Sequence, residues 1–376
     1  MDKLYSIWFT FVLSLIIVAV DCRRTYKHTL EEIAHANRPP VIDQRDCSDG
    51  ETPIFIHTPA HTSGKYHNRR MTIRRTWAQE ASQHQMRVIF VIAVPSSPNE
   101  QQLIKQEAET YGDMLQFDFV ENYYNLTIKN IAELKWAERH CNGSKYLVKL
   151  DDDVLLNVGK LAQLIQHDQI DSGLTGEVIV SPVYRDPNHK WHMPPKIYTK
   201  NSYPMIRGFG YIISMDQLPS LNEAFDTYKG EFMDIDDLFL TSVIADLANV
   251  KRNNNEHFIA YCGMDQCTIE TNLVMHGCSD SAETETMYRH WKLSDVSRCY
   301  PKNALPPSIH NSQNKIRPKS IRINGGGQLN TNRNGGATPR FLVHRSQIVA
   351  NHAYVHMLPS NSFVAPQYHQ LLFRFR

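Results

Sequence analysis

The sequence predicts an α/β protein with a mostly parallel sheet and helices on both faces. Apolar, β-prone segments at 53–57, 86–94, 115–120 and 145–150 alternate with segments of helical periodicity. Strands that alternate with helices of this length form parallel sheets, because each crossover returns the chain to the same edge. A run of aspartates follows the last of these strands, where ligands bind in such sheets.

Individual elements have their own signatures. Residues 86–94, Met-Arg-Val-Ile-Phe-Val-Ile-Ala-Val, form the clearest buried strand, and 115–120 alternates apolar and polar residues with a period of two. We predict helices at 68–80, 99–111 and 126–141. The order strand, helix, strand is therefore kept from the first predicted strand to the aspartates.

Both ends of the chain depart from this pattern. Residues 4–20 are apolar throughout and just long enough to span a bilayer core, so we expect a signal anchor or a cleaved signal peptide. As an anchor, this segment would leave residues 1–3 as a short cytoplasmic tail. Residues 21–50 are polar and predict a stem, which gives a folded domain at 51–300. Residues 301–376 begin with Asn- and Gly-rich stretches and are expected to be largely disordered.

Charge and cysteines narrow the class of protein. The formal net charge is +1 and neither sign forms a long run, which gives no electrostatic footprint for nucleic acid. Apart from Cys22, the cysteines are Cys47, Cys141, Cys262, Cys267, Cys278 and Cys299. An even number in an oxidising compartment indicates disulfides, although six cysteines allow about 15 pairings. A zinc site made of Cys262, Cys267, His276 and Cys278 is the alternative, which we rank below disulfides.

Two tripeptides agree with passage through the secretory pathway. Asn125-Leu-Thr127 and Asn142-Gly-Ser144 both match the acceptor pattern for N-glycosylation. Such tripeptides also arise by chance, so each carries little weight alone. Together with the apolar N-terminal segment they predict that most of the chain enters the lumen.

The aspartate run itself predicts a metal site. Asp151, Asp152 and Asp153 repel one another, and a divalent cation such as Mn²⁺ or Mg²⁺ removes that conflict with oxygen ligands. In an extended segment Asp151 and Asp153 lie on one side and Asp152 on the other, because side chains alternate. The alternative is a solvated acidic turn or a cluster that caps the helix expected after Asn157.

The aspartate run is one of six sequence blocks that occur in the order of a known family. The blocks are Arg70 to Trp77, Tyr123 to Lys129, Lys149 to Asn157, Lys190-Trp191 with Tyr203 to Ser214, Asp236 to Leu238, and His276 with Tyr288 and Trp291. Together they resemble the inverting β1,3-glycosyltransferases, the galactosyl- and N-acetylglucosaminyltransferases related to Fringe. The resemblance covers roughly residues 52–292 and implies a Rossmann-like, GT-A-type nucleotide-sugar transferase fold.

The resemblance implies functional roles for particular side chains. It implies that Asp237 is the catalytic base and that Asp153, His276 and Asp151 hold the metal. Donor binding is expected of Arg70, Arg74, Asp151, Asp152, Gly208 and Gly210, and acceptor binding of Trp191, Tyr203 and Asp236. Simpler interpretations stay open: Arg70 and Arg74 would pair with neighbouring acids, Asp237 would cap a helix, and Trp191 and Tyr203 would be core residues.

The implied activity is an inverting transfer from a UDP-sugar. Galactose or N-acetylhexosamine would move to the 3-hydroxyl of a glycan on a glycoprotein or glycolipid, forming a β1,3 linkage. The implied protein is a single-pass type II Golgi membrane protein with a lumenal catalytic domain at 51–300, which could be a homodimer. The alternatives are a non-catalytic family member that acts as chaperone or subunit of another glycosyltransferase, and a secreted glycan-binding protein. The sequence departs from the family at Ile206, where a tyrosine is usual, and at Asp236, where a glutamate is usual.

Overall fold

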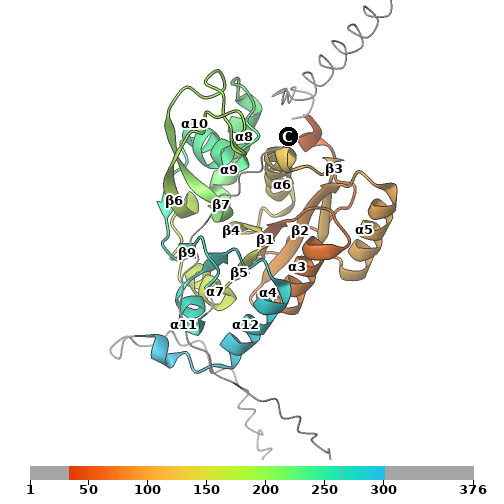
Figure 1. Cartoon of the computed structure of the whole chain (residues 1–376), viewed down its shortest axis with the longest axis vertical. Coiled ribbons are helices and arrows are strands. Elements are labelled where there is room, and N and C mark those ends of the chain that lie inside the picture. Colours follow the sequence, from red (N-terminus) through yellow and green to blue (C-terminus); the bar gives the residue numbers. More distant parts are fainter. Residues whose placement is uncertain (1–33, 264, 301–376) are drawn as a thin grey trace, which may run out of the picture. The chain divides into compact units, whose positions relative to one another are not determined.

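A seven-stranded sheet lies at the centre of this computed structural model, which describes residues 34–263 and 265–300 (Figure 1). The strand order is β3-β2-β1-β4-β7-β6-β8. The strands are β1 (Thr52–His57), β2 (Met86–Val94), β3 (Met114–Val120), β4 (Tyr146–Asp151), β6 (Leu174–Pro182), β7 (Ser202–Ser214) and β8 (Arg252–Asn254). Within this sheet β7 runs antiparallel to both of its neighbours, β4 and β6, and the other pairings are parallel. The predicted α/β class and the mostly parallel sheet are therefore confirmed.

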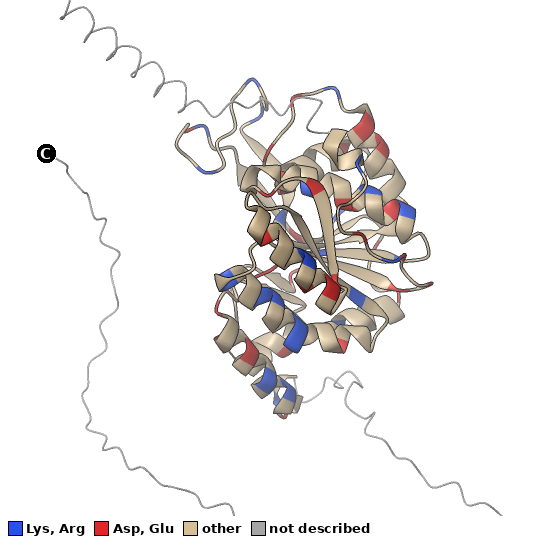
Figure 2. Ribbon diagram, turned by 90° about the vertical axis from the view of Figure 1, so that its right-hand side faces the viewer, with Lys and Arg blue, Asp and Glu red and all other residues tan. Residues whose placement is uncertain are grey.

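Helices cover both faces of the sheet, and charged residues are concentrated on the helices and loops while the strands carry few (Figure 2). The α-helices are α3 (Gly64–Arg75), α4 (Trp77–Ser82), α5 (Pro98–Tyr111), α6 (Leu126–His140), α7 (Val158–Gln166), α8 (Leu218–Thr227), α9 (Asp236–Leu238), α10 (Ala245–Leu247), α11 (Gln266–Thr271) and α12 (Ser281–Leu293). Short 3₁₀ turns form η1 (His35–Asn37), η2 (Tyr123–Asn125), η3 (Met215–Gln217) and η5 (Ser297–Cys299), and η4 (Phe239–Ile244) is a π-helix.

Alternation along the strands builds two hydrophobic cores, one on each face. On β1, Phe55 belongs to the core under α6, and Ile54 and Ile56 belong to the core under α3 and α4. Trp136 of α6 meets Phe55 edge to face at 6.0 Å, while Trp77 of α4 is 1% exposed in the opposite core. Successive residues of a strand point to opposite faces, so one strand can supply both cores.

A second, three-stranded sheet joins the C-terminal part of the domain to the end of β4. It has the order β5-β10-β9, with β5 (Val154–Leu156), β9 (Phe258–Ile259) and β10 (Val274–His276). β5 follows β4 directly, and the antiparallel register with β10 places His276 opposite Val154. A residue from late in the sequence is thereby brought beside the aspartate run.

The helix predicted at 68–80 is two helices in the structure. Thr76 separates α3 from α4 with φ −117° and ψ −111°, which is outside the helical region. Its buried hydroxyl donates a hydrogen bond to the carbonyl of Thr72 at 2.6 Å. A threonine hydroxyl that bonds back to the preceding turn bends helices, which the periodicity of the sequence does not reveal.

The disulfide prediction is confirmed. Cys47 pairs with Cys141, Cys262 with Cys278, and Cys267 with Cys299. The alternative zinc site is wrong, because its three cysteines are all consumed in disulfides. The last two bonds instead fasten the segment that carries β10 and the helices around it.

The folded domain begins before the predicted boundary at residue 51. Ile42 forms a β-bridge with Gln116, and Asp43 accepts a hydrogen bond from the indole of Trp136 at 2.8 Å. The disulfide of Cys47 then ties this segment to the end of α6. Residues 34–50 are therefore part of the domain, because their polar composition conceals a few specific anchoring contacts.

The predicted signal anchor and the predicted disordered tail both lie outside the described residues. Among the residues that the structure describes, no helix has the length and hydropathy needed to cross a membrane.

The Cys47–Cys141 bond should contribute measurably to stability. We expect the double variant Cys47→Ala/Cys141→Ala to lose about 2–5 kcal/mol of unfolding free energy, because the unfolded chain gains conformational freedom. Urea denaturation under non-reducing conditions measures this. Arg38→Ala is the control from the same segment: its exposed ion pair with Asp118 should contribute about 1 kcal/mol or less. Equal unfolding midpoints for the double variant and the wild type would show that this segment does not stabilise the domain.

Candidate active site

Three of the predicted metal ligands lie together at the carboxyl end of β4. Ligand atoms of Asp151, Asp153 and His276 are all within 4.8 Å of one another. The Nε2 atom of His276 is 3.5 Å from a carboxylate oxygen of Asp153, and the side chains of all three are partly exposed. Two carboxylates and one imidazole facing a common point form a donor set suited to a divalent cation such as Mn²⁺.

The small sheet holds this arrangement in place. The carbonyl of Asp153 accepts a hydrogen bond from the backbone N–H of Cys278 at 2.9 Å, just beyond the paired strands β5 and β10. Phe209 of β7 stacks on the imidazole of His276, with ring centroids 5.0 Å apart. The disulfide of Cys278 with Cys262 fixes the chain on the far side of His276.

Asp152 lies in the turn between β4 and β5 and is not part of the cluster of Asp151, Asp153 and His276. It accepts hydrogen bonds from the hydroxyl of Thr58 at 2.8 Å and from Arg69 at 2.6 Å. Arg69 also lies 3.4 Å from a carboxylate oxygen of Asp153. Burial raises the pKa of Asp152 to about 6, against the lowering effect of Arg69 and Thr58. The sequence analysis did not select Arg69, which belongs to α3 and reaches the acidic run from that side.

Lys149 is a second residue that the sequence analysis left without a role. Its side chain is 1% exposed, and its ammonium donates to Asp151 at 2.8 Å and to the carbonyl of Gly208 at 2.6 Å. Burial opposes the positive charge, but Asp151, Asp236 and Glu133 outweigh it and raise the pKa of Lys149. Lys149 therefore links the end of β4 to β7 and to the helix that begins at Asp236.

The predicted catalytic base stands at the start of α9, beside β7. One carboxylate oxygen of Asp237 accepts a hydrogen bond from the N–H of Leu238 at 2.8 Å. The N-cap residue of α9 is Ile235 and no side chain caps this helix, so the capping interpretation of Asp237 is wrong. Burial, together with the charge of Asp236, raises the pKa of Asp237 to about 7. Asp236 turns inward and accepts a hydrogen bond from Asn130 of α6 at 3.0 Å.

Thr241 connects this helix to β7. Its buried hydroxyl donates to the carbonyl of Asp237 at 2.6 Å and accepts from the backbone N–H of Ile206 at 2.9 Å. Thr241 lies in the π-helix η4, and such turns are frequent at functional sites. Ile206 itself is 0% exposed, so the family tyrosine is replaced here by a core residue.

The two predicted donor-binding glycines make close approaches of different kinds. A Cβ atom added to Gly208 would meet the carboxylate of Asp237 at 3.1 Å, so this glycine leaves room for the proposed base. A Cβ atom at Gly210 would meet Leu150 at 2.7 Å, inside the pairing of β4 with β7. Gly210 thus serves strand packing in the structure, and its predicted donor contact remains a prediction.

The predicted acceptor residues differ in exposure. Tyr203 is 4% exposed, and burial raises its phenol pKa to about 12, with a further contribution from the charge of Asp237. Trp191 is 41% exposed in the loop between β6 and β7. Tyr203 is therefore buried, as its core interpretation predicted, and Trp191 is open to solvent.

The structure places Arg70 and Arg74 in a buried ion-pair network on α3. Arg70 is 0% exposed and pairs with Glu107 at 2.6 Å, and Arg74 pairs with Glu107 at 2.8 Å and with Asp113 at 2.7 Å. Burial opposes ionisation of Glu107, but hydrogen bonds from the two arginines lower its pKa to about 2. Contact of either arginine with a donor would require these pairs to break.

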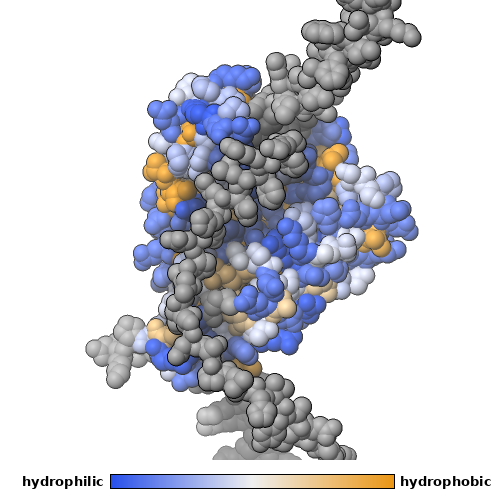
Figure 3. Space-filling model, in the orientation of Figure 1, coloured by the Kyte–Doolittle hydropathy of each residue, from blue (hydrophilic) through white to orange (hydrophobic). Residues whose placement is uncertain are grey.

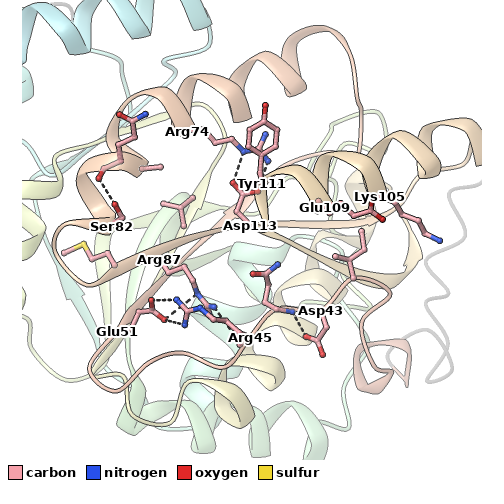
Figure 4. A pocket seen from close by; sticks show the side chains of 18 of the residues that line it. Asp43, Arg45, Glu51, Arg74, Ser82, Arg87, Lys105, Glu109, Tyr111 and Asp113 are labelled. Atoms are coloured by element: carbon pink, nitrogen blue, oxygen red, sulfur yellow. Dashed lines mark hydrogen bonds and ion pairs between the residues drawn. The ribbon is translucent and has the colours of Figure 1, made fainter.

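Arg74 also lines a hollow of about 1050 Å³ at the amino edge of the parallel strands (Figure 4). Its guanidinium stands 4.0 Å from the centroid of the Tyr111 ring and bonds Asp113, as the close-up shows. This hollow is at the end of the sheet opposite to Asp151. The geometry thus favours the ion-pairing alternative for Arg70 and Arg74.

The site and fold together define a class: an α/β domain with an acidic run at the carboxyl end of a central strand, whose donor set suits a divalent cation. Residues 68–256 match the family described as Galactosyltransferase, and the chain belongs to this family. Solved structures that align with it include a glycosyltransferase involved in glycosylation of the major capsid of PBCV-1, with TM-score 0.35 and 11% identity over 64% of this chain and 98% of that one.

Characterised relatives carry β1,3-transferase names. The chain is 30% identical to an acetylgalactosaminyl-O-glycosyl-glycoprotein β1,3-N-acetylglucosaminyltransferase of Mus musculus, over 55% of each chain. It is 32% identical to β1,3-galactosyltransferase 5 of Homo sapiens, over 46% of this chain and 57% of the relative. The chain thus spans about half the length of the curated relatives it matches.

Replacing Arg70 should test its structural role. We expect Arg70→Ala to lower the unfolding free energy by about 3–5 kcal/mol, because Glu107 would be left buried without its main partner. Chemical denaturation measures the loss, and Arg75→Ala, which breaks an ion pair whose arginine is 47% exposed, is the control. A stable Arg70→Ala protein with weakened UDP binding would instead establish the donor contact predicted from the sequence.

The two predicted glycosylation sites should differ in occupancy. The Asn125 amide nitrogen, which would carry the glycan, donates to the carbonyl of Val120 at 2.8 Å. The hydroxyl residues of both tripeptides, Thr127 and Ser144, are buried, so the asparagines make the difference. Asn142 is exposed in a turn after α6. We expect Asn142→Gln to abolish a glycosidase-sensitive mobility shift in a eukaryotic host and Asn125→Gln to leave it unchanged. The reverse pattern would contradict the assignment.

Proposed function

We propose that this protein transfers galactose or N-acetylhexosamine from a UDP-sugar to the 3-hydroxyl of a glycan, with inversion to a β1,3 linkage. The observation that carries the proposal is the convergence of Asp151, Asp153 and His276 at one point, with Asp237 on the adjoining strand edge. The β1,3-transferase names of the relatives support the linkage. Those names differ in the sugar transferred, so both donors remain within the proposal.

The three converging side chains fit a divalent cation. They offer two hard oxygens and one imidazole nitrogen, a set found with Mn²⁺ and compatible with Mg²⁺. Lys149 and Arg69 neutralise the acidic run from two sides, which leaves part of its negative charge for a cation. When bound, a divalent ion supplies Lewis-acid stabilisation for the charge that develops on a departing diphosphate.

Arg69 is the residue of this chain best placed for the donor. It is held beside Asp152 and Asp153 and is 11% exposed, so it borders the space in front of the acidic run. A guanidinium matches the oxygens of a diphosphate with two parallel hydrogen bonds. We therefore assign donor-phosphate contact to Arg69 ahead of Arg70 and Arg74.

Asp237 would take the proton in a single displacement. The acceptor 3-hydroxyl oxygen bonds to the anomeric carbon, and the bond from that carbon to the β-phosphate oxygen breaks, so that UDP leaves with the electron pair. The hydroxyl proton passes to a carboxylate oxygen of Asp237. A carboxylate with a pKa raised toward 7 is a better proton acceptor than an ordinary aspartate.

The compartment is part of the proposal. Three disulfides and a glycosylation tripeptide with an exposed asparagine, Asn142, are typical of proteins that fold in the secretory lumen. We propose a Golgi location with the catalytic domain in the lumen and residues 4–20 as the membrane anchor.

Asp237→Asn separates catalysis from binding. It keeps the shape and hydrogen bonding of the side chain but removes the proton acceptor, so kcat should fall by about 10²–10⁴. Affinity for the UDP-sugar should stay close to that of the wild type, because Asp153, His276 and Arg69 are unchanged. Purified lumenal domain, a panel of UDP-sugars with Mn²⁺ and detection of released UDP provide the assay.

Two comparisons complete this test. Wild-type kcat/KM should fall as the pH drops below about 7, because protonated Asp237 cannot accept a proton, and the variant should lack this limb. Asp236→Asn should be less impaired than Asp237→Asn. Full activity of Asp237→Asn would overturn the mechanism, and absence of transfer by the wild type with every donor would favour the chaperone or subunit alternative.

Asp153→Ala addresses the metal. Mn²⁺ should strengthen UDP binding by the wild type, and we expect this dependence to be lost in the variant, since one of three ligands is missing. Isothermal titration with and without Mn²⁺ measures it. Asp46→Ala is the matched control, because that carboxylate is 77% exposed and lies near the opposite edge of the sheet. Retained Mn²⁺ dependence in Asp153→Ala would refute the assignment of this ligand.

A further inference from the structure

The amide of Asn130, on α6, joins three elements beside the proposed base. Its nitrogen donates to a carboxylate oxygen of Asp236 on α9 at 3.0 Å, and its oxygen accepts from the hydroxyl of Tyr211 on β7 at 3.1 Å. An ionised carboxylate can only accept hydrogen bonds, and a tyrosine hydroxyl can donate, so the direction of both bonds is fixed. We call Tyr211, Asn130 and Asp236 the amide clamp.

The two side chains behind Asp236 are enclosed in the domain. Most of the visible surface is hydrophilic (Figure 3), whereas Asn130 is 1% exposed and Tyr211 is 0% exposed. A buried amide costs free energy unless its polar atoms are paired, so each member of the clamp depends on the next. Burial also raises the pKa of Tyr211 well above its ordinary value, so its hydroxyl stays protonated and remains a donor.

The amide clamp affects which of two adjacent carboxylates faces β7. Asp236 and Asp237 are consecutive at the start of α9. Consecutive residues of a helix point about 100° apart, so a contact that holds one side chain also sets the direction of the other. Asp236 is drawn toward α6, and Asp237 stands against Gly208 of β7, where an added Cβ atom would be 3.1 Å from its carboxylate.

The charges around the pair couple Asp236 to Asp237. Burial opposes the charge of Asp236 and raises its pKa, whereas Lys149 and the N–H of Asn130 favour the charged form. Burial, together with the charge of Asp236, raises the pKa of Asp237 to about 7. The other titratable groups that face the pair are Asp151 of β4, Glu133 of α6, and Tyr203 and Tyr211 of β7.

We propose that Asn130 is a positioning residue of the transfer reaction, whose amide holds Asp236 inward and so presents Asp237 to the acceptor hydroxyl. The inference rests on the proposed function and adds a residue that acts on the base only through Asp236. Contact of Asp236 with an acceptor, predicted from the resemblance, would require its carboxylate to leave the amide. A purely structural role of Asn130 would lower stability without changing the pH dependence of the reaction, so the two roles can be separated.

Asn130→Leu tests the proposal with a side chain of similar size that cannot donate a hydrogen bond. The charged form of Asp236 loses a partner, so Asp237 loses part of the charge that raises its pKa. The limb of kcat/KM that lies near pH 7 in the wild type should therefore move to lower pH by about one unit, with little change in the KM for the UDP-sugar. Tyr211→Phe removes only the hydroxyl that holds the amide and should move the limb in the same direction by less.

Asn222→Leu is the matched control. Asn222 of α8 is 4% exposed, and its amide donates to the carbonyl of Leu134 in α6 at 3.3 Å. This substitution also removes a buried amide that binds α6, but at a site that does not touch Asp236. It should lower the unfolding midpoint and leave the pH limb in place.

NMR titration of isotope-labelled aspartate gives the pKa of Asp237 without turnover, and Asp237→Asn identifies its signal. A lower pKa in Asn130→Leu and Tyr211→Phe, with the wild-type value in Asn222→Leu, supports the proposal. An unchanged pKa in a folded Asn130→Leu protein, or an equal shift in Asn222→Leu, would overturn it. If Asn130→Leu does not fold, Tyr211→Phe decides by the same criterion. Absence of transfer by the wild type with every donor counts against the proposed function alone, because the NMR titration still tests the amide clamp.

Discussion

The buried ammonium of Lys149 is the interaction on which the acidic centre depends. A charge enclosed in protein is tolerated only with partners, and Lys149 has Asp151 and the Gly208 carbonyl in direct contact, with Asp236 and Glu133 close enough to raise its pKa. Through these contacts one side chain links β4, at whose carboxyl end the candidate metal ligands lie, to β7, which adjoins the proposed base. The polar groups behind it are equally enclosed, including a 2.7 Å pair between His57 and Glu133. The centre is therefore rigid because its charges cannot separate without being left unpaired.

Much of the fold follows from periodicity, and the exceptions have identifiable causes. The predicted strand at 86–94 coincides with β2, because a continuous apolar run of this length is buried on both faces. The N-terminal boundary was misplaced, since a disulfide and a single indole hydrogen bond hold a segment whose composition is polar. The break at Thr76 depends on one hydroxyl, which no pattern of apolar residues encodes.

The candidate site was predictable to a similar degree. The cluster leaves out Asp152, but alternation along a strand is not the reason, because Asp152 and Asp153 form a turn after β4. The resemblance supplied His276, which no spacing rule connects to the two aspartates. It was harder to predict from the sequence which arginine of α3 faces the acidic run. Arg69 and Arg70 are neighbours in sequence but point about 100° apart on a helix, so the one that faces the acidic run depends on the phase of α3 against the sheet. That phase is set by packing of α3 and α4 in the core, which only the three-dimensional structure reveals.

The β5–β10 pairing imposes an order on biosynthesis. Asp151 and Asp153 are translated well before His276. The N-terminal half of the sheet can therefore form before the third residue of the cluster, His276, has been made. Likewise, the disulfide of Cys47 cannot form until Cys141, which is 94 residues later in sequence, has been made. The cluster of Asp151, Asp153 and His276 is therefore complete only after β10, the last strand of the described domain, has been made.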